Sequence, residues 1–359
     1  MKRFFKKLDL ICKNKEKKEV FIFNNLEIKY DETCNYFVGK KDIKPFKNIF
    51  ILDDSVTTKL AKLLEIDQVE YKDNIYYLNR DLVVDKDYFF PKNKTLIVKE
   101  GIKINFKNDS LIISEGSIFF KGSKEKPIII DGIDGKGSII LHNNKFNFNN
   151  VIVKNLSFPK DQNKILYGGI NIINSDLGIL NTKIINSNSE DAINIISSNS
   201  LIKNLIVKDI QADAIDIDFG KLNFENIFCE DISNDCLDAS GAYVNGSFLT
   251  GKKINDKGLS FGENSIGEIF NIDFQNTRLG IAVKDGSKLK LSNYKLTDNE
   301  YDLAVFNKKN EYESSSLNIS NPVEENDLKF LIGFKNDIIK DNVYLDEKID
   351  NKKINELFY

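Results

Sequence analysis

The stretch from Gln211 to Gly241, "QADAIDIDFGKLNFENIFCEDISNDCLDASG", decides the fold. It holds two similar segments, "DAIDID" and "DCLDAS", which begin 22 residues apart. Each alternates apolar and polar residues, the pattern of a strand with one buried face. The same step of 22 residues links one apolar position at Ile193, Ile215, Leu237, Leu259, Ile281 and Leu303, and Ile170 precedes the series by 23. A fixed period of this length indicates a repeat architecture.

A second apolar segment follows each of these strands, for example "NLIVK" and "NIFCE", and turn-forming residues fill the gaps. No unit holds an uninterrupted helical period, and a propeller blade needs about twice this length. A unit of 22 residues is the size of one rung of a parallel β-helix, whose apolar side chains are buried only when rungs stack. We therefore predict an all-β solenoid of this kind.

Asparagines recur just before the second segment, at Asn181, Asn204, Asn226, Asn271 and Asn293. Amide side chains stacked at a turn would hydrogen-bond along the solenoid, which is a structural role. The fourth unit, "AYVNGSF", displaces this pattern by about two residues. Its turn is therefore expected to be remodelled.

The repeat predicts three parts of the chain. Residues 91–320 form the β-helix, with earlier and less regular coils before residue 165. Residues 1–90 form a small mixed α/β N-terminal cap, with a strand at "NIFIL" and a helix in "DDSVTTKLAKLLEI". Residues 321–359 form a C-terminal cap, or a linker to a further domain after residue 359. Caps are expected because terminal rungs expose edge strands.

Alternation places the aspartates of the repeat on the outward side. If Ile215 and Ile217 point inward, Asp216 and Asp218 point outward, and the next rung places Asp238 beside Asp216. Stacked strands lie about 4.8 Å apart, so the outward aspartates form one patch. Its members are Asp191, Asp213, Asp216, Asp218, Asp235 and Asp238, and Lys257, Arg278 and Lys284 border it.

Stacked like charges are destabilising unless a cation, neighbouring basic side chains or protonation offsets them. Asp216, Asp218 and Asp238 lie mid-strand, where Asp is disfavoured, which favours a functional role. The column of Asp191, Asp213 and Asp235 has a structural alternative, in which it lies at a turn and caps backbone amides.

Small residues form a column beside the aspartates, at Ala192, Ala214, Cys236, Gly258 and Gly280. An outward strip of this kind would make a shallow groove suited to an extended polymer. The alternative is steric crowding at a corner of the coil.

Composition limits the classes of function. The net charge of −3 gives no sign of a nucleic-acid-binding surface. No run approaches the roughly 20 apolar residues that span a bilayer, although the basic start "MKRFFKK" allows weak peripheral membrane contact. The four cysteines, Cys12, Cys34, Cys229 and Cys236, show no CxxC spacing and are expected to be thiols. With no clear secretory signal, a cytoplasmic location is expected.

The segments "DAINI", "DAIDIDF", "NDCLDASGA", "DKGLSFGENS" and "LGIAVKDGS" resemble the right-handed parallel β-helices of the pectate-lyase-like superfamily. They are most similar to β-helix segments found next to kinase-like domains of the spore-coat-protein-H (CotH) type. The resemblance covers residues 165–310 and implies a carbohydrate-facing protein. It departs from the polygalacturonase pattern, because Gly-His-Gly is absent and the only histidine, His142, lies in another coil. His142 is expected to be an ordinary surface or turn residue.

The resemblance also implies roles for residues of the patch. Asp216, Asp218 and Asp238 would be catalytic, and Lys257 or Lys284 would be the base. Asp213 and Asp235 would hold a divalent cation such as Ca²⁺, and Asn194, Ser260 and Arg278 would contact substrate.

Three functions follow as alternatives. In the first, a cation neutralises a sugar carboxylate while a lysine removes a proton, as in a lyase or epimerase. In the second, Asp218 and Asp238 form the diagonal pair of an inverting glycoside hydrolase. In the third, the solenoid is a non-catalytic carbohydrate-binding scaffold. The expected polymer is an acidic surface or capsular polysaccharide.

Overall fold

The computed structural model describes residues 21–23, 26–30, 36–40, 60–159, 166–324 and 327–359, in two compact units, 1–54 and 55–359. The first unit contains an antiparallel sheet of β1 (Phe21–Phe23), β2 (Leu26–Tyr30) and β3 (Tyr36–Lys40). The basic start, Cys12, Cys34 and "NIFIL" lie outside the described residues. No helix among the described residues has the length and apolarity needed to cross a membrane.

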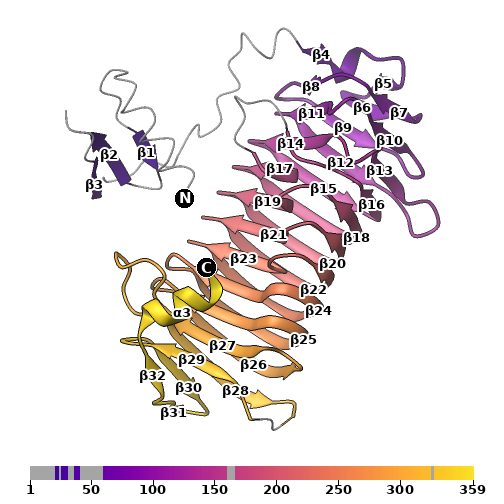
Figure 1. Cartoon of the computed structure of the whole chain (residues 1–359). Helices are drawn as coiled ribbons and strands as arrows, with labels where there is room; N and C mark the ends of the chain where they lie inside the picture. Colours follow the sequence, from indigo (N-terminus) through magenta and orange to yellow (C-terminus); the bar gives the residue numbers. More distant parts are fainter. Residues whose placement is uncertain (1–20, 24–25, 31–35, 41–59, 160–165, 325–326) are drawn as a thin grey trace. The chain divides into compact units, whose positions relative to one another are not determined.

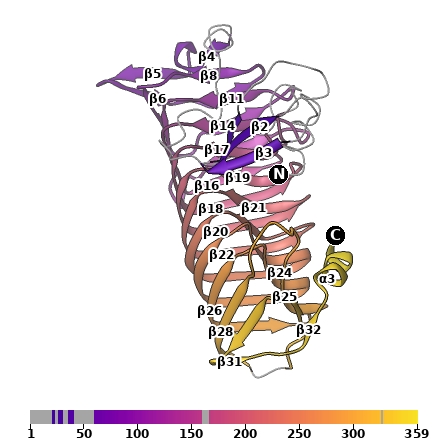
Figure 2. The same ribbon diagram turned by 90° about the vertical axis from the view of Figure 1, so that its left-hand side faces the viewer.

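The second unit is an all-β parallel solenoid of the right-handed type with about 11 turns (Figures 1 and 2). One stack of strands, which we call the anchor face, runs through it. In order it contains β4 (Ala61–Lys62), β8 (Tyr88–Phe90), β11 (Leu111–Ser114), β14 (Ser138–His142), β17 (Gly168–Ile173), β19 (Asp191–Ile196), β21 (Asp213–Asp218), β23 (Leu237–Ser240), the ends of β24 (Tyr243–Gly262) and β25 (Ile266–Lys284), β27 (Tyr301–Phe306), β29 (Phe330–Gly333) and β32 (Lys348–Ile349).

The remaining strands form the other sides of the coil. They are β6 (Ile75–Leu78), β7 (Leu82–Val84), β9 (Thr95–Val98), β10 (Lys103–Phe106), β12 (Ser117–Lys121), β13 (Ile128–Gly132), β15 (Lys145–Asn149), β16 (Val151–Lys154), β18 (Asp176–Ser187), β20 (Asn199–Ile210), β22 (Lys221–Ile232), β26 (Lys288–Thr297), β28 (Ser316–Pro322) and β30 (Asp337–Lys340). Two short strands, β5 (Val69–Lys72) and β31 (Val343–Tyr344), pair antiparallel with β6 and β30.

The observed register confirms the repeat. The aligned positions on successive anchor strands are Ile170, Ile193, Ile215, Leu237, Leu259, Ile281 and Leu303, the series that the sequence indicates. These side chains lie in one buried apolar core that runs through the coils. The core excludes the outward position of each strand, as the alternation of apolar and polar residues requires.

The solenoid extends beyond the expected limits of 91 and 320. Its first parallel pairs join β4 to β8 and β6 to β9, and its last joins β29 to β32. Within the described part of the expected helix, the chain forms β4 and the short 3₁₀ helix η1 (Leu63–Glu65). The strands before residue 91 show no regular period, so the sequence alone does not identify them as rungs.

The asparagine turn is present as expected. Asn181, Asn204 and Asn226 all take positive φ, and their amides form a ladder with N–O distances of 2.9 and 3.1 Å. The expected shift in the fourth unit is wrong. Ser247 and Leu249 keep the common register, and Phe248 occupies the asparagine position with a φ of 60°. The ladder is therefore interrupted by a substitution and not by a displaced turn.

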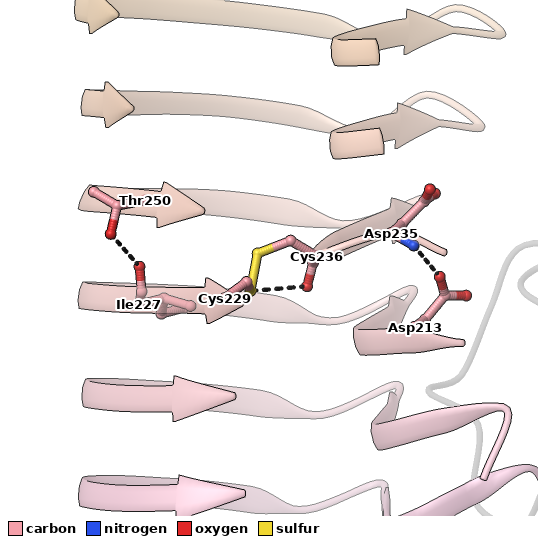
Figure 3. Close-up of a disulfide and its surroundings, with 6 residues drawn as sticks. All are labelled: Asp213, Ile227, Cys229, Asp235, Cys236 and Thr250. Atoms are coloured by element: carbon pink, nitrogen blue, oxygen red, sulfur yellow. Dashed lines mark hydrogen bonds between the residues drawn. A yellow bond between two sulfur atoms is a disulfide. The ribbon is translucent and has the colours of Figure 1, made fainter. Parts of the chain in front are cut away.

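Cys229 and Cys236 form a disulfide across one corner of the coil (Figure 3). Their Cα atoms lie 5.9 Å apart, and both side chains are buried in the core. The expectation of free thiols is wrong for this pair. The seven-residue spacing matches no known motif. The turn between β22 and β23 brings the two sulfur atoms together.

Removing the disulfide should lower the stability of the solenoid. A cross-link that closes a loop of this size contributes about 2–3 kcal/mol, chiefly by restricting the unfolded chain. Cys229→Ala with Cys236→Ala should therefore lower the urea midpoint of unfolding, and reduction of the wild type should do the same. Equal midpoints for oxidised and reduced wild-type protein would contradict this assignment.

Candidate functional site

The outward positions of the anchor face stack in register. Asn194, Asp216, Asp238, Ser260 and Ala282 follow one another on five successive strands. A second column begins with Asp191 and Asp213, and Asp218 is paired with Ser240. We call Asp191, Asp213, Asp216, Asp218, Asp235 and Asp238 the acidic patch. The structure brings these six residues together as the sequence predicts.

The outward columns become apolar downstream of the patch. Leu279, Ala282, Ala304 and Phe306 form a second buried cluster with Ile354 and Phe358 of α3 (Asn351–Phe358). The helix therefore covers the part of the anchor face where the outward side chains are apolar. Asp350 precedes the helix, and its side chain caps it by accepting a hydrogen bond from the backbone amide of Lys352.

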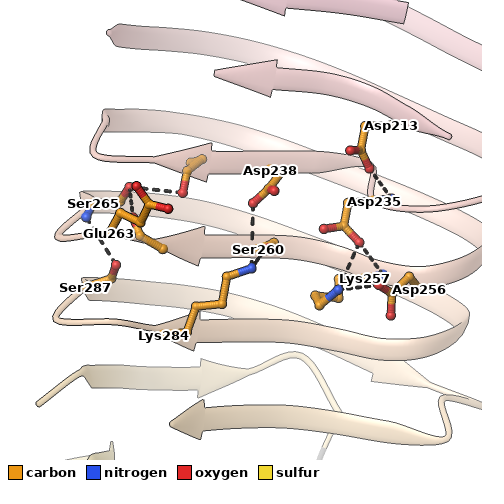
Figure 4. Close-up of polar contacts among 12 residues, drawn as sticks. Asp213, Asp235, Asp238, Asp256, Lys257, Ser260, Glu263, Ser265, Lys284 and Ser287 are labelled. Atoms are coloured by element: carbon orange, nitrogen blue, oxygen red, sulfur yellow. Dashed lines mark hydrogen bonds and ion pairs between the residues drawn. The ribbon is translucent and has the colours of Figure 1, made fainter. Parts of the chain in front are cut away.

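Two buried lysines neutralise part of the patch (Figure 4). The Lys257 ammonium lies 3.4 Å from Asp235 and also contacts Asp256. The Lys284 ammonium lies 3.9 Å from Asp238 and donates a 2.6 Å hydrogen bond to the Ser260 hydroxyl. The two buried lysines thus act as internal counter-ions in a site whose carboxylates are buried or half-buried.

Backbone amides donate hydrogen bonds to carboxylates of the second column, which contains Asp213 and Asp235. Asp213 accepts hydrogen bonds from the Asp235 backbone amide at 2.7 Å and from the Asn234 side chain at 2.6 Å. Asp235 accepts one from the Lys257 backbone amide at 2.9 Å. These contacts are those of the capping alternative for the column, in which the aspartates fix the turn that enters each anchor strand.

Burial raises the pKa of most of these carboxyls. It raises the pKa of Asp191 and Asp218 to about 7, from an ordinary value of 3.8, and neighbouring carboxylates add to the effect. The pKa of Asp216 is raised well above its ordinary value for the same two reasons. For Asp235 burial prevails over the attraction of Lys257 and raises the pKa to about 6.

Asp238 shifts in the opposite direction. Burial alone would raise its pKa, but Lys284 and Lys257 lower it below the ordinary value. Against the effect of burial, Asp235 raises the pKa of Lys257, and Tyr359 and Asp238 raise the pKa of Lys284. At neutral pH, Asp238 is therefore ionised while Asp218 is about half protonated, and both lysines carry their charge.

The small-residue column does not form a groove. Ala192, Ala214 and Cys236 are buried in the interior core. A Cβ atom on Gly258 would lie 2.7 Å from the Gly280 carbonyl oxygen, too close for any side chain. The crowding alternative is therefore correct, because these residues lie where the coil turns inward.

The predicted substrate-contact residues divide into two groups. Asn194 and Ser260 lie in the patch, where the Asn194 amide donates to Asp191 at 2.6 Å. Arg278 instead holds α3, since its guanidinium donates to the Leu357 carbonyl and lies over the Phe358 ring. His142, expected near the surface, is buried in β14, and burial lowers its pKa to about 4.

The carboxylates do not converge as cation ligands do. Among the described residues, no group of three or more Asp, Glu, His or Cys side chains is arranged to hold a metal ion. Asp213 and Asp235 instead direct oxygens at backbone amides. These positions therefore do not fit a calcium site as they stand, and calcium binding remains a prediction.

Two residues near the acidic patch were not predicted from the sequence. Tyr359 follows α3, and its hydroxyl accepts a 3.2 Å hydrogen bond from Lys284. Lys308 follows β27, and its ammonium lies 3.1 Å from the centroid of the Tyr359 ring. Neither belongs to a repeated column, so the period gives no signal for them.

No known protein family profile matches the chain, and no curated protein matches its sequence. Several solved structures are similar to the chain. One is the catalytic domain of a GH87 alpha-1,3-glucanase with nigerose, at 14% identity and a TM-score of 0.37 over 75% of this chain and 60% of that one. Another is the tailspike gp42 of Acinetobacter phage vb_AbaP_AS12, at 9% identity and a TM-score of 0.38 over 76% and 58%.

A third is the periplasmic alginate epimerase AlgG, at 13% identity and a TM-score of 0.24 over 76% of this chain and 80% of that one. The chain spans about 60% of the glucanase and tailspike chains. Similarity at this level concerns the solenoid alone and transfers no residue roles.

The raised pKa values predict how stability depends on pH. Between about pH 4 and pH 7 the folded patch keeps protons that the unfolded chain has released, so the free energy of unfolding falls as pH rises. Asp216→Asn mimics the protonated carboxyl and should stabilise the protein at pH 8 by on the order of 1 kcal/mol. Thermal unfolding at pH 5 and pH 8 tests this.

The control is Glu268→Gln, which removes an exposed carboxylate of β25 outside the patch. This variant should show the same difference in stability between pH 5 and pH 8 as the wild type. A wild-type protein that becomes more stable from pH 5 to pH 8, or an Asp216→Asn variant that behaves as the control does, would refute the assignment.

Proposed function

We propose that the protein hydrolyses a polysaccharide at the acidic patch, with Asp218 as general acid and Asp238 as general base. The observation that supports this is the opposite shift of two neighbouring carboxyls. Burial raises the pKa of Asp218 to about 7, whereas Lys284 and Lys257 hold that of Asp238 below its ordinary value. Two carboxyls with separated pKa values can act as the acid and the base of one reaction.

The spacing of the pair favours an inverting reaction. Asp216 is the registered partner of Asp238, and Asp218 lies two residues further along the same strand. With parallel strands about 4.8 Å apart and a rise of about 3.3 Å per residue, the backbone positions of Asp218 and Asp238 are about 8 Å apart. Inverting glycosidases place their carboxyls roughly 6.5–9.5 Å apart, which leaves room for the attacking water. Asp218 would protonate the leaving oxygen, and Asp238 would take a proton from that water.

Lysine-based lyase or epimerase chemistry has less support. Lys257 and Lys284 have raised pKa values against the effect of burial, because Asp235 favours the charged form of Lys257 and because Tyr359 and Asp238 favour that of Lys284. A lysine that stays protonated is a poor general base. A non-catalytic scaffold remains the second candidate, since internal counter-ions such as the Lys257–Asp235 pair also stabilise a rigid binding surface.

The surroundings of the patch suit an extended polymer. Two polar depressions lie along the adjoining corner of the coil, and Asn255 and Asn276 line both. Arg278 lines the second depression and lies 3.8 Å from Asp256, which contacts Lys257. Side chains of this kind offer hydrogen bonds to sugar hydroxyls. The proposed polymer is the acidic surface or capsular polysaccharide that is expected from the sequence.

Single substitutions test the assignment. Asp218→Asn and Asp238→Asn should each lower the release of reducing ends about 10²–10⁴-fold while binding is retained, because each removes one proton transfer. Substrates would come from a panel of acidic and neutral polysaccharides, and the anomeric configuration of the first product would be followed by NMR. Glu268→Gln is the control for folding and activity.

The products separate the alternatives. Reducing ends of inverted configuration support the proposal, whereas unsaturated chain ends or epimerised residues would establish the lyase or epimerase alternative. Binding without any turnover would establish the scaffold. Full activity in both aspartate variants would exclude this pair as the acid and base.

A further inference from the structure

Three lysine ammonium groups surround one exposed aromatic ring. The ring of Tyr359, whose side chain is 54% exposed, has Lys308 at 3.1 Å, Lys257 at 5.0 Å and Lys284 at 5.8 Å from its centroid. Its position is fixed through α3, which Arg278 anchors to the solenoid. An exposed ring beside several cations presents a flat apolar surface next to positive charge.

The three cations differ in how they are compensated. Lys257 is paired with Asp235 and Asp256, and Lys284 is paired with Asp238. For Lys308 the ion pairs of the described residues include no carboxylate partner, although the next residue, Lys309, is paired with Glu263. Lys308 is thus a half-buried cation that lies over an aromatic face, and Asp238 favours its charge without an ion pair between the two groups.

The backbone holds Lys308 in this position. Asp285 accepts hydrogen bonds from the backbone amides of Lys308 at 2.8 Å and of Lys309 at 2.7 Å. One oxygen of the Asp285 carboxylate therefore fixes the main chain at Lys308 and Lys309. Burial, together with repulsion from Lys284 and Lys257, lowers the pKa of Lys308 to about 7. An anion bound beside it would remove this penalty.

We infer that Lys308 and Tyr359 form a specificity subsite that selects a negatively charged sugar unit of the polymer. The ring would stack on the apolar face of the sugar, and the ammonium would pair with its carboxylate. This inference rests on the proposed function, because it assigns the substrate class of the same site. Lys308 follows β27, three strands beyond Asp238 on β23, which is about 14 Å along the axis at the strand spacing.

The offset concerns the backbone, because the Lys308 ammonium also lowers the pKa of Asp238. Lys308 would determine affinity for acidic polymers and would help to keep Asp238 ionised, without itself transferring a proton. Asp218 and Asp216 lie on the opposite side of Asp238 along the axis. The site would therefore orient a polymer with a charged unit toward α3 and the reacting bond toward β21.

Paired probes test the inference. Polygalacturonate, alginate and hyaluronate, each beside its carboxyl-reduced form, would be titrated into the full-length protein at low salt. The wild type should bind at least one charged polymer about tenfold more tightly than its reduced form, the effect of one charge-assisted contact. Lys308→Met should abolish this preference and leave binding of the reduced form unchanged.

Matched variants distinguish the subsite from a structural or catalytic role. Lys308→Arg should retain the preference, and Tyr359→Ala should weaken binding of both forms. Lys290→Met, at an exposed position of β26, controls for loss of surface charge, and Tyr344→Ala, at an exposed aromatic of β31, controls for loss of a ring. If Lys308→Arg keeps binding but loses turnover, Lys308 transfers a proton and the inference is wrong.

The other possible results distinguish failure of the subsite from failure of the proposed function. Equal binding of charged and reduced polymers, or a preference that survives Lys308→Met, would overturn the subsite. If a neutral polymer is hydrolysed through Asp218 and Asp238 without any charge preference, the proposed function stands and only this inference fails. Absence of binding to every probe would count against both.

Discussion

Lateral stacking of equivalent side chains is the constraint on which this structure depends. Each coil places the same outward position one strand spacing from its neighbours, so a residue type that recurs in the sequence meets itself in space. Amides tolerate this arrangement, and Asn204 and Asn226 form a ladder at the turn. Stacked carboxylates repel one another, and on the anchor face their charge is removed by protonation or compensated by a buried lysine.

The outward columns divide the anchor face into two regions. Where the positions are Asp, Asn and Ser, the face carries the patch. Where they become Leu279, Ala282, Ala304 and Phe306, α3 covers them. The helix thereby protects an apolar surface and also places Tyr359 beside the lysines. The change from polar to apolar outward residues along the repeat thus determines where the acidic patch ends. It also determines where α3 packs and places Tyr359.

Much of this arrangement follows from the sequence. The period of 22 gives the fold and the register, and alternation gives the outward direction of Asp216, Asp218 and Asp238. Properties that depend on the corners were not predictable. The disulfide, the inward direction of Ala214 and Phe248 at an asparagine position all depend on how the chain turns between strands.

Lys308 and Tyr359 were missed for a different reason, because they reach the site from segments outside the repeat. The disulfide bears on the expected cytoplasmic location, since such bonds persist mainly in oxidising compartments. The location therefore remains a prediction that the Cys229–Cys236 pair does not favour. The link to CotH-type proteins likewise rests on the sequence resemblance alone.

The central claim is that the fold raises the pKa of Asp218 and lowers the pKa of the neighbouring Asp238. The most direct measurement is an NMR titration of the aspartate side-chain carboxyl carbons, with Asp218 and Asp238 assigned through their Asn variants. The account predicts that Asp218 titrates near pH 7 and Asp238 below its ordinary value of 3.8. If both carboxyls titrate together near the ordinary value, the acidic patch is a solvated surface and the proposed acid and base do not exist.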